Sequence, residues 1–276
     1  MPELPEVETV RKALLLKLQN KKIINITILH NNVFNKNNIE EVKQKIKNQT
    51  INDIKRRGKW LVFELDNYYL LSHLRMEGKY LYRNKSQKVE KHELVIFNIN
   101  NEFELRYKDV RKFGKMELVE KDKLNESSLK KLGYEPWDKN LTIAYLKEKY
   151  KNKSIPIKTL LLDQSIIVGI GNIYADEILF LSKINPHTKG KDLTEKNLKD
   201  IIENTKKVLE TAIKEGGTTI RSYTSEEGVT GLFQNDLNVH MKENEPCLVC
   251  KTKIKKDKIG GRSSYYCSNC QKEIKN

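Results

Sequence analysis

The sequence predicts an α+β chain of several domains: an N-terminal antiparallel β-sandwich or barrel, a helical region, and a small cysteine-bearing ribbon at the C-terminus. Three observations predict this order. Short segments of alternating or β-branched apolar residues fill the first half, helical spacing replaces them beyond residue 125, and the last 36 residues hold all four cysteines. A chain of 276 residues is long enough for about two domains with proper cores.

The expected elements follow the hydrophobic periodicity along the chain. Val7, Val10, Leu14 and Leu18 share one face of an opening helix. Strands are expected at 23–29, 50–54, 60–65, 69–74, 94–99, 102–107 and 116–119, with one helix among them at 39–46. Further helices are expected at 141–150, 157–162, 173–181 and 193–213. We therefore place an N-terminal domain at 1–125, a linker at 126–140, a helical domain at 141–235 and the ribbon at 236–276.

The composition is polar and strongly basic. Lys and Arg number 52 against 37 Asp and Glu, a formal net charge of +15, and 38% of the residues are hydrophobic. That apolar share excludes a disordered chain, and no apolar run approaches the roughly 20 residues of a membrane span. The N-terminus is acidic rather than basic, unlike a secretory signal. We expect an intracellular protein with an anionic partner, although charge alone leaves a merely solvated lysine-rich surface as an equal alternative.

The cysteines form two Cys-x2-Cys pairs, Cys247 with Cys250 and Cys267 with Cys270, separated by 16 residues. In an intracellular protein this spacing is typical of a tetrahedral four-thiolate zinc site; free or disulfide-bonded thiols are the alternative. Four thiolates leave no open position for water, so the single zinc is expected to be structural. Residues 241–276 hold nine Lys and Arg against four Asp and Glu, which makes the ribbon itself basic.

The chain begins Met1-Pro2-Glu3-Leu4-Pro5-Glu6. Removal of the initiator methionine would leave Pro2 as a free secondary amine, and an α-amino group is far less protonated at pH 7 than a lysine. Such an amine can add to the C1′ of a sugar and form an iminium, which acts as an electron sink for β-elimination. Glu3 could protonate the ring oxygen. The alternative is that Pro2 only begins a helix.

Five segments, in this order, resemble bacterial formamidopyrimidine-DNA glycosylase: MPELPEVETV at the start, HLRMEGK at 73–79, GIGNIYADE at 169–177, GGTT at 216–219, and the terminal cysteine pairs. Each segment alone is weakly specific, but five in register over nearly the whole chain are highly specific. The resemblance implies a β-sandwich, a helix–two-turn–helix domain and a zinc β-ribbon, with DNA between them. It also implies excision of 8-oxoguanine and formamidopyrimidines, followed by strand cleavage through β,δ-elimination.

The resemblance implies catalytic roles for four residues. Pro2 matches the Schiff-base nucleophile and Glu3 the acid, while Lys59 of the segment RRGK matches a lysine that contacts a phosphate and assists catalysis. Arg262 matches the ribbon arginine that grips phosphates and assists δ-elimination. From the sequence alone, Lys59 could equally be an ordinary turn lysine.

The resemblance also implies a set of DNA contacts. Met76 would fill the space of the extruded base. In the segment DVRKFG, Arg111 would pair with the cytosine left unpaired, and Phe113 would wedge beside it. Without the resemblance, Met76 and Phe113 would be taken as core or strand-surface residues. Two departures from the family pattern occur, Val110 in place of proline and Leu94 in place of a second histidine.

The other DNA-binding candidates are His92, Lys153, Lys158 and Asn172. Asn172 follows Gly169-Ile170-Gly171, which lacks the third glycine of a dinucleotide loop and is expected instead as the turn that offers N–H groups to a phosphate. Segment 217–228 corresponds to the loop that closes over the extruded base; its candidates are Thr218, Thr219, Arg221 and Tyr223. A plain connector to the ribbon is the alternative for this segment.

These expectations describe a base-excision repair enzyme with glycosylase and AP lyase activities. The expected partner is double-stranded DNA that contains an oxidised purine; no membrane is involved, and the protein is expected to be a monomer in the bacterial cytoplasm, at the nucleoid. Two alternatives stay open. One is an endonuclease VIII-like enzyme for oxidised pyrimidines, against which Leu4 and Met76 argue. The other is a non-catalytic zinc-bearing DNA-binding protein.

Overall fold

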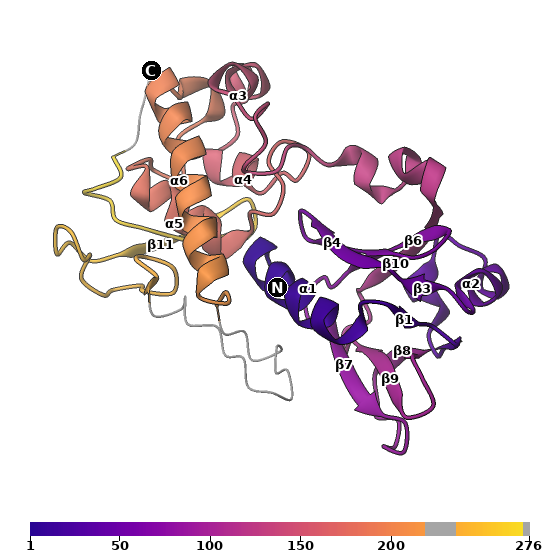
Figure 1. Cartoon of the computed structure of the whole chain (residues 1–276). Coiled ribbons are helices and arrows are strands. Elements are labelled where there is room, and N and C mark those ends of the chain that lie inside the picture. Colours follow the sequence, from indigo (N-terminus) through magenta and orange to yellow (C-terminus); the bar gives the residue numbers. More distant parts are fainter. Residues whose placement is uncertain (219–235, 273–276) are drawn as a thin grey trace. The chain divides into compact units, whose positions relative to one another are not determined.

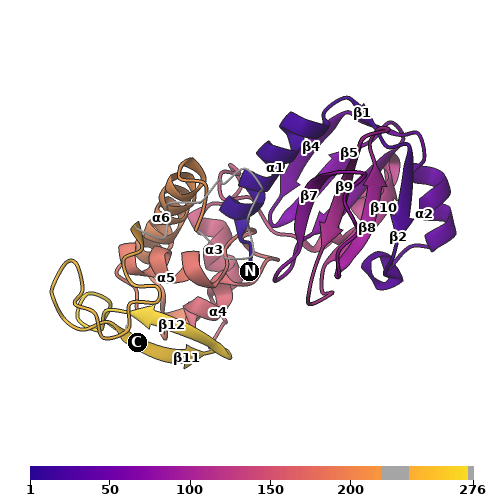
Figure 2. The same ribbon diagram turned by 90° about the horizontal axis from the view of Figure 1, so that it is seen from below.

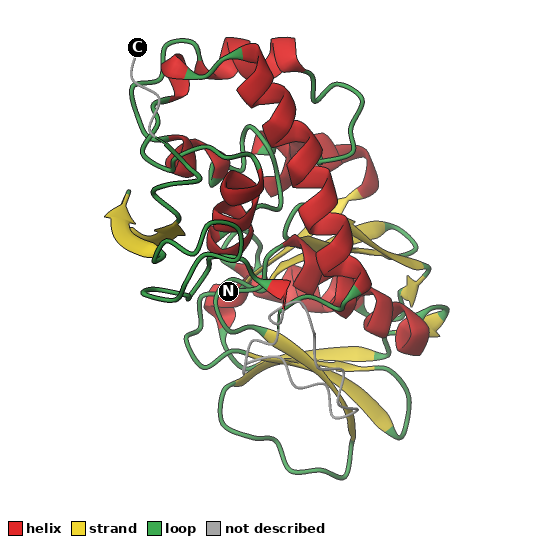
Figure 3. Cartoon of the chain, turned by 90° about the vertical axis from the view of Figure 1, so that its left-hand side faces the viewer, coloured by secondary structure: helices red, strands yellow, loops and turns green. Residues whose placement is uncertain are grey.

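The computed structural model in Figure 1 describes residues 1–218 and 236–272. The chain divides into two compact units, and each is treated by itself. The N-terminal unit is Met1–Lys130; the C-terminal unit takes in Lys131–Thr218 and the described residues after 235. Figure 3 colours the helices red and the strands yellow. No helix in the described part of the chain combines the length and apolar character of a membrane span.

The N-terminal unit is a β-sandwich. Its strands are β1 (Lys21–Lys22), β2 (Asn25–Ile28), β3 (Thr50–Ile51), β4 (Asp53–Arg57), β5 (Trp60–Glu64), β6 (Tyr68–His73), β7 (Lys79–Asn84), β8 (Glu93–Asn98), β9 (Phe103–Lys108) and β10 (Lys115–Glu120). One sheet has the strand order β10-β6-β5-β4 and the other β2-β8-β9-β7, and all neighbouring strands are antiparallel. Buried side chains of alternate residues, such as Leu61 and Phe63 of β5 and Leu105 and Tyr107 of β9, form one core between the sheets.

Two helices cover the sandwich. Helix α1 (Leu4–Leu18) packs on β4 and β5, and its apolar face is buried as the periodicity predicts. Helix α2 (Ile39–Ile46) packs against β2 and has the predicted bounds. Its N-cap is Asn38, whose side chain accepts two backbone N–H groups. Short 3-10 turns lie at η1 (Asn31–Phe34), η2 (Lys121–Glu126) and η3 (Ser128–Lys131).

The strand register gathers several connections at one end of the sandwich. Arg57 pairs with Trp60 at the end of β4, Trp60 with His73 at the end of β6, and His73 with Lys115 at the start of β10. In the other sheet, Lys79 pairs with Lys108. The β4–β5 turn and the segments 74–78 and 109–114, which cross between the sheets, therefore share this end. We call it the loop end.

The C-terminal unit is helical, with a small ribbon packed on it. Its helices are α3 (Ile143–Tyr150), α4 (Ile157–Leu161), α5 (Asn172–Leu181) and α6 (Glu195–Lys214), with a 3-10 turn at η4 (Gly190–Asp192). Strands β11 (Lys255–Ile259) and β12 (Arg262–Tyr266) form an antiparallel hairpin, and β12 packs against α5, as Figure 2 shows. Gly260 and Gly261 both have positive φ, which a two-residue turn between these strands requires.

These elements confirm the predicted fold class, and each predicted strand and helix is present within a few residues. One strand of the sandwich is not among the predicted ones. β7 (Lys79–Asn84) has alternating aromatic side chains, but its lysine, arginine and asparagine hide the pattern in the sequence. Tyr80 and Tyr82 pack against the core from this strand.

Candidate functional site

The N-terminus is fixed by a capping box around the first turn of α1. The side chain of Glu3 accepts the backbone N–H of Glu6, and the Glu6 carboxylate accepts the backbone N–H of Glu3 at 2.8 Å. Pro5 lies in the first turn, where its missing N–H costs nothing. Pro2 therefore precedes the helix rather than beginning it. It is buried, and so is Glu3, with 2% of its surface exposed.

Helix α1 is oriented on the sheet by a small ion-pair network. Glu8 Oε2 accepts from Arg56 Nε at 3.1 Å, and Glu8 Oε1 accepts from Arg11 at 2.7 Å. Burial raises the pKa of Glu8, but the hydrogen bonds and charges of Arg11 and Arg56 outweigh it and leave that pKa lowered. Arg11 also donates to the carbonyl of Ile54 at 3.1 Å. Because Arg11 lies beside Ile54 and Glu8 beside Arg56, the start of α1 points toward the loop end.

The β4–β5 turn brings Lys59 to the same end. It is a two-residue turn with Gly58 at a φ of 56°, the conformation that a hairpin with glycine in first position needs. Lys59 is buried, with 6% of its surface exposed. The imidazole of His73 packs edge-on against Trp60 at 4.9 Å. Burial, followed by the charges of Arg75, Lys59 and Lys115, lowers the pKa of His73 to about 3, so this histidine is neutral. The three neighbouring cations make the loop end basic.

Three exposed apolar residues lie at the loop end. Met76 is 36% exposed, Val110 54% and Phe113 52%, although all three could have been core residues by type. The guanidinium of Arg111 lies over the Phe113 ring at 4.8 Å. Asp109 organises this loop: its Oδ1 accepts the N–H of Arg111 at 3.0 Å and its Oδ2 accepts the N–H of Gly114 at 2.8 Å. Asp109 is itself buried.

His92 lies beside the same loop. Its φ is 72°, an uncommon conformation for a residue with a side chain, and its carbonyl accepts the N–H of Asp109 at 3.0 Å. The next residue, Glu93, is buried and bonded to the buried Arg106 at 3.1 Å. Leu94, which replaces a second histidine, is a buried core residue. His92 is thus held at the loop end by its backbone.

In the C-terminal unit, the start of α5 lies against the ribbon. The side-chain amide of Asn172 donates to the carbonyl of Ser263 at 3.0 Å, next to the exposed Arg262. A Cβ on Gly260 would lie 2.8 Å from the hydroxyl of Thr159, so the tip of the ribbon touches α4 through its backbone. The N-terminus of a helix favours anions, and the N-terminus of α5 lies beside the exposed guanidinium of Arg262.

The two lysine candidates of this unit lie in different surroundings. Lys153 is exposed on the segment between α3 and α4. Lys158 has no exposed surface; its ammonium is ion-paired with the buried Asp176 and donates to the carbonyl of Asn172 at 3.2 Å. Nδ1 of His240 lies 2.7 Å from the other oxygen of Asp176. Lys158 therefore supports the start of α5 from inside.

Glu177 joins α5 to the segment that leads into the ribbon. Its carboxylate accepts the N–H groups of Asn238 at 2.8 Å, Val239 at 3.0 Å and His240 at 2.9 Å, and the side-chain amide of Asn238 at 2.9 Å. It is fully enclosed, with 1% of its surface exposed. A buried carboxylate that accepts four N–H groups is well satisfied, so it fixes this segment firmly.

Replacing this carboxylate by an amide should loosen the unit. In Glu177→Gln, one acceptor oxygen becomes an NH2 that faces N–H donors, and we expect the free energy of unfolding to fall by about 2–4 kcal/mol. Urea denaturation followed by circular dichroism measures this. The control is Glu203→Gln, an exposed carboxylate 3.8 Å from Lys199, which should change stability by less than about 0.5 kcal/mol. Equal losses in the two variants would contradict the role given to Glu177.

The four cysteines converge as their spacing predicts. All four sulfur atoms lie within 4.8 Å of one another, with Cys247 to Cys270 at 3.9 Å and Cys250 to Cys267 at 3.4 Å. Tetrahedral Zn–S bonds of about 2.3 Å place the sulfurs roughly 3.8 Å apart, so the donor set fits one structural zinc. Hydrogen bonds from Thr252 and Asn269 lower the pKa of Cys250 to about 5.

Of the four candidates in the segment after α6, Thr218 is described and is buried. Thr219, Arg221 and Tyr223 lie outside the described residues.

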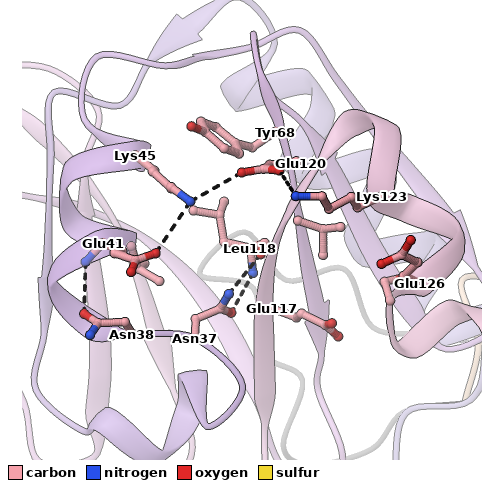
Figure 4. Close-up of a pocket in the computed structure, with 13 residues that line it drawn as sticks. Asn37, Asn38, Glu41, Lys45, Tyr68, Glu117, Leu118, Glu120, Lys123 and Glu126 are labelled. Carbon is pink, nitrogen blue, oxygen red and sulfur yellow. Dashed lines mark hydrogen bonds and ion pairs between the residues drawn. The ribbon is translucent and has the colours of Figure 1, made fainter.

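A cavity of about 260 Å³ lies at the other end of β10, between α2 and η2 (Figure 4). Several of its charged side chains are paired: Lys45 lies 3.6 Å from Glu41 and 3.5 Å from Glu120, which also pairs with Lys123. Asn37 bridges the backbone of Leu118 with two hydrogen bonds of 3.0 Å and so covers the open edge of β10. We assign this cavity no ligand.

Comparison with known proteins agrees with this geometry. Three family models match in succession: formamidopyrimidine-DNA glycosylase N-terminal domain over residues 1–116, its H2TH domain over 132–224, and a zinc finger found in FPG and IleRS over 244–272. Formamidopyrimidine-DNA glycosylase of Bacillus anthracis is 44% identical over 276 residues, 99% of this chain and 100% of that protein. The chain belongs to the formamidopyrimidine-DNA glycosylase family.

Relatives from other bacteria and solved structures agree. The Bacillus subtilis (strain 168) family member is 43% identical over 273 residues, 98% of this chain and 99% of that protein. A mutant of the Lactococcus lactis FPG, solved with Fapy-dG containing DNA, has a TM-score of 0.92 at 39% identity, covering 99% of this chain and 100% of that chain. MutM in complex with carbocyclic 8-oxo-G containing DNA has a TM-score of 0.91 at 37% identity, with the same coverage.

Several polar residues that support the site are not among the site residues predicted from the sequence. His73, Asp109, Asp176 and Glu177 all lie inside or next to the segments that carry the family resemblance, yet none is among the predicted site residues. Their roles depend on tertiary partners, such as the backbone N–H groups that Asp109 and Glu177 accept. Asp176 and Glu177 could have been identified because they are acidic residues within an otherwise apolar segment, and a buried carboxylate needs hydrogen-bond partners.

Proposed function

We propose that this protein is a DNA-formamidopyrimidine glycosylase with AP lyase activity, which removes 8-oxoguanine and formamidopyrimidines from duplex DNA. The observation that carries the proposal is the loop end of the N-terminal unit. This end carries the start of α1, a cationic turn and the exposed side chains of Met76 and Phe113, in a chain of the formamidopyrimidine-DNA glycosylase family. Family members of similar length have been solved with DNA that contains Fapy-dG or carbocyclic 8-oxo-G.

In this proposal, Pro2 is the nucleophile once Met1 has been removed. Its nitrogen adds to C1′ of the damaged nucleotide as the glycosidic bond breaks, and the proton that the nitrogen loses goes to the departing base. Glu3 donates a proton to the ring oxygen, so that the C1′–O4′ bond opens and an iminium forms. The resulting iminium cannot lose its charge by releasing an N–H proton, so it acidifies the C2′ proton and permits β-elimination of the 3′ phosphate. Lys59 and Arg262 offset the charge of the departing phosphates.

DNA binding is divided among the remaining residues. Met76 and Phe113 occupy the space of the extruded base, and Arg111 bonds to the cytosine left behind, whose edge offers acceptors. His92, Lys153 and Asn172 contact phosphates, while Lys158 acts through the start of α5 that it supports. Thr218, Thr219, Arg221 and Tyr223 contribute to the loop over the lesion. The unit boundaries proposed are 1–125, 126–140, 141–235 and 236–276.

The zinc is structural in this proposal. When bound to the four cysteines it stabilises the ribbon and thereby the backbone that presents Arg262. We also propose that the protein acts as a monomer in the cytoplasm, at the nucleoid, where its substrate lies.

The lesion preference is tested by comparing two duplexes. We expect single-turnover excision of 8-oxoguanine opposite cytosine to exceed excision of thymine glycol by at least about tenfold, which corresponds to about 1.4 kcal/mol of transition-state discrimination. Gel analysis of end-labelled strands measures both rates. A preference for thymine glycol would instead support an endonuclease VIII-like enzyme for oxidised pyrimidines.

A further inference from the structure

We propose that Tyr107 is a positioning residue that sets the place of both segments carrying the void-filling side chains. Its phenol lies between Gly78, two residues after Met76, and Gly114, the residue after Phe113. This inference rests on the proposed function, because it concerns how Met76, Arg111 and Phe113 reach the space of the extruded base.

The ring of Tyr107 is itself immobilised by the sandwich. Tyr107 lies on the inner face of β9 and has no exposed surface. It pairs with Tyr80 of β7, whose ring centroid is 5.2 Å away, and Tyr80 packs against Phe63 of the opposite sheet at 5.8 Å. The Tyr80 hydroxyl donates to Ser72 at 2.8 Å. Tyr107 is therefore anchored to both sheets and can act as a fixed support.

Both segments touch this support through their backbones. A Cβ built on Gly78 would lie 2.2 Å from the Tyr107 hydroxyl oxygen, and a Cβ built on Gly114 would lie 1.7 Å from it. Real side-chain carbons essentially never approach another heavy atom within 3.0 Å. At Gly114 the three nearest atoms all belong to Tyr107, at 1.7, 2.7 and 3.1 Å. Any side chain there must therefore displace either the loop or the phenol.

A displacement at Gly114 would reach the DNA-facing side chains directly. Gly114 follows Phe113, and its N–H is held by Asp109, whose other carboxylate oxygen holds the N–H of Arg111. These bonds make the segment 109–114 move as one piece. Misplacement of a positioning group by about 1 Å can cost about a hundredfold in rate. The phenol thus determines whether Arg111 and Phe113 enter the duplex at the correct depth.

The test uses Gly114→Ala, Tyr107→Phe and the double variant in the full-length, zinc-loaded protein. We expect Gly114→Ala to slow single-turnover excision of 8-oxoguanine from duplex DNA by about a hundredfold. Tyr107→Phe removes the oxygen at 1.7 Å and leaves ring carbons at 2.7 and 3.1 Å, so the clash is relieved in part. The double variant should therefore recover part of the loss, at least about fivefold over Gly114→Ala, as expected for residues in contact. A 2-aminopurine next to the lesion should show slower unstacking in Gly114→Ala and partial recovery in the double variant.

A second substrate separates positioning from chemistry and from folding. Borohydride trapping on a single-stranded oligonucleotide with an abasic site needs no extrusion of a base, so every variant should trap it within about twofold of the unaltered protein. Tyr150→Phe is the matched control, since it loses a fully buried phenol hydroxyl of the C-terminal unit, outside the sandwich core that holds Tyr107. It should excise 8-oxoguanine within about twofold of the unaltered protein.

Three results would overturn the proposal: no recovery in the double variant, an equal loss in Tyr150→Phe, or a parallel loss of single-stranded trapping. Failure of the proposed function itself is distinguishable, because the unaltered protein would then neither excise 8-oxoguanine nor form a trapped adduct.

Discussion

Borohydride reduction in the presence of an 8-oxoguanine duplex is expected to trap a covalent adduct through the nitrogen of Pro2. An α-amino group with a pKa near 7.7–8.0 leaves about a tenth of the molecules neutral and nucleophilic at pH 7. While Met1 remains attached, that nitrogen is an amide and cannot attack. Protein that retains Met1 should therefore form no adduct. In Pro2→Gly, the primary amine forms an iminium that still has an N–H and can lose its charge by deprotonation. This variant should therefore trap at least about tenfold less.

Glu3 offers a variant that separates folding from catalysis. The side chain of Glu3 caps α1 by accepting the N–H of Glu6, and an amide oxygen can accept that bond equally well. Glu3→Gln should consequently fold normally but have no proton to donate to the ring oxygen. We expect excision of 8-oxoguanine to fall by about 10²–10⁴-fold, while trapping on a preformed abasic site persists.

The measurement is an electrophoretic shift of end-labelled DNA, combined with mass spectrometry of the N-terminus to establish whether Met1 is present. A strong adduct from protein that retains Met1 would refute the assignment of Pro2. Absence of an adduct from correctly processed protein, with duplex binding intact, would support a non-catalytic zinc-bearing DNA-binding protein instead.

Local features of the fold are accessible from the sequence because they depend on near neighbours. Helix α2 (Ile39–Ile46) has the predicted bounds, since Asn38 and the spacing of its apolar residues define it without help from the rest of the chain. The cysteine spacing likewise predicts a convergent set of four sulfurs. Strand β7 escapes prediction because Lys79, Arg83 and Asn84 flank its inward tyrosines, and periodicity alone does not interpret these polar residues.

The candidate site depends far more on tertiary structure. Nothing in the sequence shows that Met76 and Phe113 are exposed, because exposure follows from the crossing of two segments at one end of the sandwich. Lys158 looks like a surface lysine in the sequence, yet its charge is buried against Asp176, an ion pair formed across 18 residues. Gly78 and Gly114 resemble ordinary turn glycines until Tyr107 is placed between them. The family resemblance supplies candidate roles, and the structure supplies the contacts that position those residues.

Removal of the zinc is expected to unfold the ribbon and abolish high-affinity binding to duplex DNA. The buried apolar cluster under the ribbon is small, consisting of Phe180, Val239, Cys247, Ile254 and Cys267. Two of its members are themselves metal ligands, so little apolar burial remains without the ion. Binding of a structural zinc supplies about 10–16 kcal/mol in small metal-stabilised modules, far more than such a cluster can provide.

The loss should be confined to the ribbon. The helices of the C-terminal unit have their own core, with Leu146, Ile178 and Leu209 fully buried, so the far-ultraviolet circular dichroism of the helices should change little. Binding to duplex DNA, measured by fluorescence anisotropy, should weaken by at least about a hundredfold. Its salt dependence should also become shallower by about 0.9 for each phosphate that the ribbon neutralises.

Two variants and a metal add-back make this experiment decisive. Cys250→Ser should reproduce the effect of chelation, whereas Ser268→Ala, in the loop between the last two cysteines but outside the ligand set, should bind zinc and DNA normally. Returning zinc to the chelated protein should restore both affinity and salt slope. The slope is the informative quantity, because general unfolding would remove binding at every salt concentration, whereas loss of the ribbon removes only its own phosphate contacts. Unchanged affinity after verified removal of the metal would mean that Arg262 and the ribbon lysines do not hold the DNA.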